Sequence, residues 1–122
     1  MKKEETIQNY LEAIYIISTK KENVRAIDIV NYMNFSRPTV SIALKQLEDD
    51  KYIKLDDNNI ILTEKGKKIA LTMYERHEYI AKLLMKLGVD EKTAYKDSCL
   101  IEHDLSAKSF EAIKKAAKKF LK

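Results

Sequence analysis

The order of apolar and polar residues along the chain predicts a mostly helical protein. Apolar residues recur at steps of three and four from Ile7 to Ile17, which predicts an amphipathic helix over residues 4–18. After a polar stretch, a shorter pattern predicts a second helix over residues 26–33. The side chains expected to face the core in this second helix are Ile27, Val30 and Met33.

A third helix is predicted over residues 37–50, only a few residues after the second. Asn34 suits the left-handed conformation that often ends a helix, Ser36 suits an N-cap, and Pro38 falls in the first helical turn. The buried positions expected in this helix are Val40, Ala43, Leu44 and Leu47.

The pattern changes at Tyr52, where two short β-rich runs flank a polar turn at Asp56–Asn59. Such an arrangement is typical of a β-hairpin. A helix, a short helix, a tight turn, a helix and a hairpin follow one another in the order of a winged helix-turn-helix. We therefore expect residues 1–63 to form a winged helix-turn-helix DNA-binding domain.

Helical periodicity returns after the hairpin and continues to the end of the chain. Three helices are expected, over residues 64–87, 91–104 and 107–121, with N-caps at Thr63, Asp90 and Ser106 and a stop at Gly88. In the first of them the expected apolar set is Ile69, Leu71, Tyr74, Ile80, Leu83 and Leu84. Gly66 lies in its first turns, at a cost of up to about 1 kcal/mol relative to alanine. The fold class is thus mostly α with one small β-hairpin, and residues 64–122 form a second, helical domain.

The exposed face of the 37–50 helix is the candidate DNA-reading surface. Ile42 lies two residues from both Val40 and Leu44, roughly 200° around the helix from each, so it points outward. An exposed isoleucine is either an ordinary surface residue or a contact for a thymine methyl group in the major groove. The candidate DNA-binding residues are Ser36, Arg37, Pro38, Thr39, Ser41, Ile42 and Lys45. The acidic hairpin tip argues against deep insertion into the minor groove.

The amino-acid composition indicates a cellular compartment for the protein but does not identify its binding partner. The chain of 122 residues has a net charge of +4, and residues 76–122 carry the whole excess. The lysines of the last helix are explained by a solvated face, so overall charge does not establish nucleic-acid binding. A single cysteine indicates a free thiol in a reducing cytoplasm, and no apolar run is long enough for a membrane span.

One short segment concentrates chemistry. In "CLIEHDLS", Cys99, Glu102 and His103 stand at i, i+3 and i+4, so in a helix they share one face. A thiol, a carboxylate and an imidazole together are potential metal ligands, although an amphipathic helix can also place them together by chance.

Five motifs in the right order extend this observation over nearly the whole chain. They are "NYLEAIYIIS" at 9–18, "DIVNYMNFSRPTVSIALKQLEDDKYI" at 28–53, "LTEKGKKIA" at 62–70, "ERHEYI" at 75–80 and "SCLIEHDLS" at 98–106. Together they resemble the diphtheria toxin repressor family of iron- and manganese-dependent transcriptional regulators. The layout is most similar to the short manganese-regulator branch, which lacks a C-terminal SH3-like domain.

The resemblance implies a metal site and its ligands. Carried over by position, the ligands are Asn9, Glu12, His77, Cys99, Glu102 and His103. Two positions depart from the manganese branch, which has Asp in place of Asn9 and Glu in place of Cys99, whereas Glu12 is of the manganese type. The ancillary site of the iron branch is expected to be lost, because its Glu and His positions fall on Ala81 and Tyr95.

This resemblance also implies the function. It indicates a cytoplasmic homodimer that binds a palindromic operator on double-stranded DNA and represses metal-uptake genes, with Fe²⁺ or Mn²⁺ as corepressor. The softer thiolate and imidazole donors favour Fe²⁺, while Zn²⁺ and Co²⁺ are expected to substitute in vitro.

Three other functions are consistent with parts of the sequence. A winged-helix regulator that has lost metal control would explain Asn9. A hydrolytic or metal-handling protein would use Glu12 or Glu102 as a general base, but it leaves the helix-turn-helix unexplained. A winged helix used only for protein contacts would explain the acidic tip. We expect no enzymatic activity.

Overall fold

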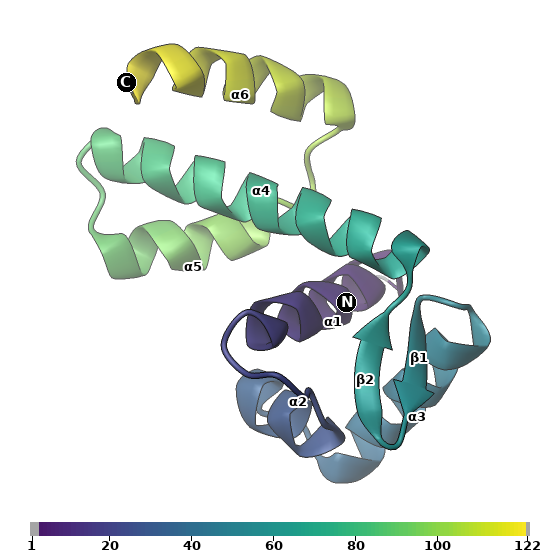
Figure 1. Cartoon of the computed structure of the whole chain (residues 1–122). Helices are drawn as coiled ribbons and strands as arrows, with labels where there is room; N and C mark the ends of the chain where they lie inside the picture. Colours follow the sequence, from purple (N-terminus) through teal and green to yellow (C-terminus); the bar gives the residue numbers. More distant parts are fainter. Residues whose placement is uncertain (1–2, 122) are drawn as a thin grey trace. The chain divides into compact units, whose positions relative to one another are not determined.

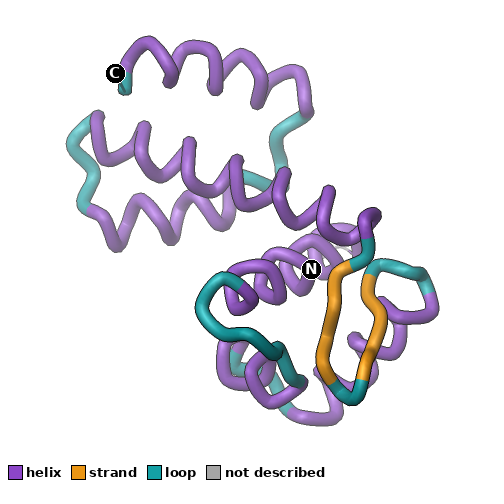
Figure 2. The backbone as a smooth tube through the Cα atoms, in the orientation of Figure 1, coloured by secondary structure: helices purple, strands orange, loops and turns teal. Residues whose placement is uncertain are grey.

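The computed structural model describes residues 3–121, and the chain divides into two compact units, Met1–Leu71 and Thr72–Lys122. The first unit holds α1 (Lys3–Ser18), α2 (Ala26–Met33), α3 (Arg37–Asp49), β1 (Ile53–Asp56), β2 (Asn59–Leu62) and the start of α4 (Glu64–Lys86). The second unit holds the rest of α4 with α5 (Glu91–Ile101) and α6 (Ala107–Phe120). Within residues 3–121, β1 and β2 form one antiparallel sheet, drawn in orange in Figure 2, and the other elements are helices, which confirms the predicted fold class.

The core of the first unit is built from the apolar stripes of α1, α2 and α3 together with one residue from each strand. Leu11, Ile29 and Val40 are fully buried. The expectation for Ile27 is wrong, because this side chain is 39% exposed. Ile27 lies two residues from Ile29, about 200° around the helix, so α2 buries Ile29 and packs Val30 and Met33 partly against the core.

The turn between α2 and α3 has the expected chemistry. Asn34 adopts the left-handed conformation with φ 58° and ends α2. Ser36 is the N-cap of α3, and its Oγ accepts a hydrogen bond from the backbone N–H of Thr39 at 3.2 Å. This turn fixes where α3 begins and so which residues its N-terminal end presents.

The hairpin is closed by a two-residue turn. Ile53 pairs with Leu62 and Asp56 with Asn59 in an antiparallel register, and both turn residues, Asp57 and Asn58, have positive φ. The loop before α2 contacts the edge of β2 that faces away from β1. There, the N–H of Ile60 donates a hydrogen bond to the carbonyl of Val24 at 2.8 Å.

The first turn of α4 passes close to the chain just before the hairpin. Thr63 is the cap, and its Oγ1 accepts from the N–H of Gly66 at 3.2 Å. A Cβ atom on Gly66 would stand 2.1 Å from the carbonyl oxygen of Tyr52. The glycine that looked unfavourable for a helix is therefore required by this close approach.

In the second unit α4 packs against both remaining helices. Tyr95 on α5 donates its hydroxyl to Glu78 Oε2 at 3.1 Å, and on α6 Lys114 pairs with Glu75 at 3.0 Å. Figure 1 shows α5 and α6 following α4 through short connections. Gly88, with φ 103°, ends α4 as expected.

Two expectations for the second half of the chain need correction. Leu71 is 40% exposed, so it does not belong to the buried set of α4. The helix expected over residues 91–104 ends at Ile101, with Glu102 as its C-cap. Within residues 3–121, no helix is both long and apolar enough to cross a membrane.

Candidate metal centre and DNA-binding face

In the second unit, two predicted ligands lie beside His77 and a third, His103, lies beside Glu102. Glu102 Oε2 lies 3.1 Å from His77 Nδ1, and Cys99 Sγ lies 3.5 Å from the same nitrogen. The other carboxylate oxygen of Glu102 lies 3.5 Å from His103 Nε2. Although α5 ends before Glu102, the thiol of Cys99 and the carboxylate of Glu102 both contact the His77 imidazole, and the His103 imidazole lies beside the same carboxylate.

The donor set fits a divalent transition metal. Glu102 is 1% exposed and the side chain of His103 is 3% exposed, whereas Cys99 is exposed at the surface. A buried carboxylate is costly unless a cation or hydrogen-bond donors compensate for its charge. A metal with imidazole, carboxylate and thiolate ligands would supply that compensation, because these are the donor types that Fe²⁺, Mn²⁺, Co²⁺ and Zn²⁺ accept.

Arg76 and Ser98, which were not predicted from the sequence, attach the backbone of residues 98–105 to α4. The guanidinium of Arg76 donates from Nη1 to the carbonyl of Glu102 at 3.0 Å and to that of Leu105 at 2.7 Å. Ser98 is fully buried, and its hydroxyl donates to the carbonyl of His77 at 2.6 Å. Arg76 lies between Met73 and Ile80 on the buried side of α4. A charged residue within this apolar stripe was the sequence signal that could have identified it.

The position of the ancillary site contains a hydrogen-bonded tyrosine. The ring of Tyr95 lies 5.2 Å from the ring of His77, and its hydroxyl is engaged by Glu78. Burial raises the pKa of Tyr95, and the nearby carboxylate of Glu78 raises it further. The hydroxyl therefore stays protonated and acts as a hydrogen-bond donor.

The other two predicted ligands, Asn9 and Glu12, belong to the first unit. Both lie on α1, where Asn9 is half-buried and Glu12 is 6% exposed. A neutral amide offers only its carbonyl oxygen to a metal, while Glu12 offers a full carboxylate.

The predicted DNA-binding residues form one exposed face at the N-terminal end and along one side of α3. Ile42 is 73% exposed, as its position predicted. Ser36 Oγ and Thr39 Oγ1 are 2.8 Å apart, and Lys45 pairs with Asp49 at 3.4 Å. All of the predicted DNA-binding residues are exposed, namely Ser36, Arg37, Pro38, Thr39, Ser41, Ile42 and Lys45.

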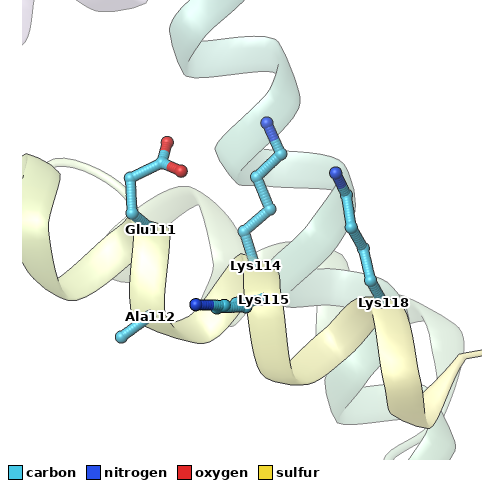
Figure 3. A pocket seen from close by; sticks show the side chains of 5 residues that line it. All are labelled: Glu111, Ala112, Lys114, Lys115 and Lys118. Carbon is cyan, nitrogen blue, oxygen red and sulfur yellow. The ribbon is translucent and has the colours of Figure 1, made fainter.

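A surface hollow on α6 is lined mainly by lysine side chains. It is lined by Glu111, Ala112, Lys114, Lys115 and Lys118 (Figure 3). The lining includes none of the predicted ligands. Lys114 is engaged by Glu75, whose carboxylate raises the pKa of the lysine. This surface matches the solvated lysine face expected from the sequence.

Comparison with known families covers both halves of the chain. The N-terminal DNA-binding domain of iron dependent repressors matches residues 3–59. The metal-binding and dimerisation domain of iron dependent repressors matches residues 63–121. The chain belongs to the diphtheria toxin repressor and manganese transport regulator family. Both parts of a metal-responsive, DNA-binding repressor are therefore present.

Individual relatives agree with this assignment. The transcriptional regulator MntR of Bacillus subtilis is 33% identical over 109 residues, which are 88% of this chain and 77% of the relative. The manganese regulator SloR has a similar structure, with a TM-score of 0.80 and 27% identity over 92% of this chain. A structure of ScaR with bound Zn²⁺ shares the fold, with a TM-score of 0.76 and 23% identity. The chain spans 53% of the SloR and ScaR chains, about half their length.

Proposed function

We propose that this protein is a metal-activated transcriptional repressor that uses Fe²⁺ or Mn²⁺ as corepressor. The observation that carries the proposal is that Cys99 and Glu102 contact His77, and His103 lies beside Glu102, in a chain whose other unit is a winged helix-turn-helix. Residues 1–63 bind DNA, and residues 64–122 bind the metal and dimerise. A homodimer of this kind suits a palindromic operator, in the cytoplasm, upstream of metal-uptake genes.

The proposed ligands are the four residues of the second unit together with Glu12 and, as a weaker neutral donor, Asn9. The metal supplies positive charge that compensates for the carboxylates of Glu12 and Glu102. Without the metal, two carboxylates that share one site would repel each other, which would weaken the link between the α1 ligands and those of the second unit. The coupling required is modest, since about 1–3 kcal/mol changes DNA affinity by about 5–150-fold.

The identity of the metal depends on two residues. Cys99 offers a soft thiolate, which favours Fe²⁺, while Glu12 offers a hard carboxylate, which suits Mn²⁺. The similar protein SloR is described as a manganese regulator. We favour Fe²⁺ because the proposed ligands combine a soft thiolate with two imidazoles, and such donors suit Fe²⁺ better than Mn²⁺.

Anaerobic fluorescence anisotropy with the DNA upstream of the protein's own gene tests the proposal. Titrations are run with chelator, with Fe²⁺ and with Mn²⁺ at one stated salt concentration. Metal is expected to tighten binding by about 5–150-fold, and the more effective ion identifies the corepressor. Equal affinity under all three conditions would support the regulator without metal control instead.

The exposed isoleucine of α3 provides a second test. Replacing Ile42 by alanine is expected to weaken operator binding by about 1 kcal/mol, because an apolar contact to a thymine methyl group is lost. Operators with uracil in place of thymine lack that methyl group, so they should weaken the unchanged protein but not the Ile42→Ala variant. Leu87→Ala, at a position 65% exposed in the second unit, is the matched control. A uracil effect of equal size in both proteins would show that Ile42 does not read thymine.

A further inference from the structure

The segment that carries three of the proposed ligands is attached at both ends to consecutive residues of α4. Before Cys99, the hydroxyl of Ser98 donates to the carbonyl of His77. After His103, the carbonyl of Leu105 accepts from Arg76, which also binds the carbonyl of Glu102. The backbone from residue 98 to residue 105 is therefore held at each end by the helix that supplies the ligand His77.

Arg76 satisfies carbonyl groups that a helix end leaves without partners. The last four carbonyls of an α-helix lack intrahelical donors, and a cation at that end interacts favourably with the helix dipole. The amide of Glu102 still donates to Ser98, and the amide of Asp104 donates to Ile101. The Glu102 and Leu105 carbonyls are those to which Arg76 donates. Glu102 is the C-cap of α5 and Leu105 lies beyond it, so Arg76 holds the backbone at the helix end and just after it.

The environment of Arg76 fixes the direction of its side chain. Arg76 is 8% exposed, and the guanidinium carbon lies 5.3 Å from the centre of the Phe110 ring on α6. A planar guanidinium packed on an aromatic ring in this way has few alternative rotamers. It can therefore hold the two carbonyls at constant positions.

We propose that Arg76 is a positioning residue for the metal site. It fixes the backbone from Glu102 to Leu105, and so places the Glu102 side chain beside His77 and the His103 side chain beside Glu102, before a metal arrives. The proposal rests on the function proposed above. Partners that orient metal ligands typically contribute 10–100-fold to metal affinity. Arg76 contributes to metal affinity by holding the backbone of the ligand residues rather than by binding their side chains.

The experiment compares Co²⁺ binding by Arg76→Met, Arg76→Lys and the unchanged full chain under anaerobic conditions. Titration calorimetry measures Co²⁺ affinity, and the thiolate-to-cobalt absorption band reports whether Cys99 is a ligand. Arg76→Met is expected to lower Co²⁺ affinity by about 10–100-fold while the metal-free circular dichroism spectrum stays helical. Arg76→Lys keeps the charge and is expected to bind with intermediate affinity. Added guanidinium ion should restore part of the affinity of Arg76→Met.

Lys86→Met, an exposed basic position on α4, is the matched control and should bind Co²⁺ normally. If Arg76→Met does not fold, the affinity of Arg76→Lys and the exchange rates of its amides at 102–105 provide the test. Normal Co²⁺ affinity in both arginine variants would overturn the positioning role and leave the proposed function intact. Failure of the unchanged chain to bind Co²⁺ would overturn the proposed function, and the role of Arg76 with it.

Discussion

Replacing Glu102 by glutamine is expected to abolish the increase in DNA affinity that metal produces. Glu102 contributes one carboxylate oxygen beside His77 and the other beside His103. Glutamine has nearly the same shape, but it offers one neutral oxygen and an amide NH₂ group that cannot ligate a cation. The full effect of about 5–150-fold should therefore disappear, while binding in the presence of chelator stays unchanged.

The measurement is the anisotropy titration described above, with Glu91→Gln as the control. Glu91 lies at the start of the same helix and is exposed, so its replacement should preserve the response to metal. Thermal unfolding with chelator checks that both variants fold. A Glu102→Gln protein that still binds DNA more tightly with metal would contradict the ligand role of this residue.

The second large effect concerns stability. Gly66→Ala is expected to lower the free energy of unfolding by about 1–3 kcal/mol, because the added Cβ would overlap the Tyr52 carbonyl oxygen. That oxygen cannot move freely, since it accepts hydrogen bonds from both the N–H and the hydroxyl of Thr63. Helix propensity alone predicts the opposite sign, a gain of about 1 kcal/mol.

Urea denaturation of the metal-free protein, followed by circular dichroism, measures this difference. Lys67→Ala, at an exposed position in the same turn of α4, is the control and should change stability little. A Gly66→Ala midpoint above that of the unchanged protein would mean that the helix start relaxes away from Tyr52.

Local chemistry made most of the fold predictable. The caps at Ser36, Asp90 and Ser106 each accept the backbone hydrogen bond expected of them. The turn at Asp57–Asn58 and the stop at Gly88 likewise depend on residues that tolerate positive φ. Such features are set by a few neighbouring residues, so the sequence alone is sufficient to locate them.

Features that depend on contacts between distant segments were not predictable in the same way. Ile27 fits an apolar pattern as well as Ile29 does, and only packing against α1 and α3 separates them. The backbone at the end of α5 is bound by Arg76, which lies 26 residues before Glu102 in the chain. For the same reason, the sequence located the ligand candidates through resemblance but gave no sign of how their backbone is held.

The contact between Val24 and the hairpin has a consequence for solubility. An open strand edge presents unpaired N–H and C=O groups, which other chains can use to extend the sheet. Here Val24 occupies the outer edge of β2, where it binds Ile60 through its carbonyl and Asn59 through its amide. The outward N–H of Ile60 is therefore already paired within the chain, so this donor is not available to a strand added from another molecule.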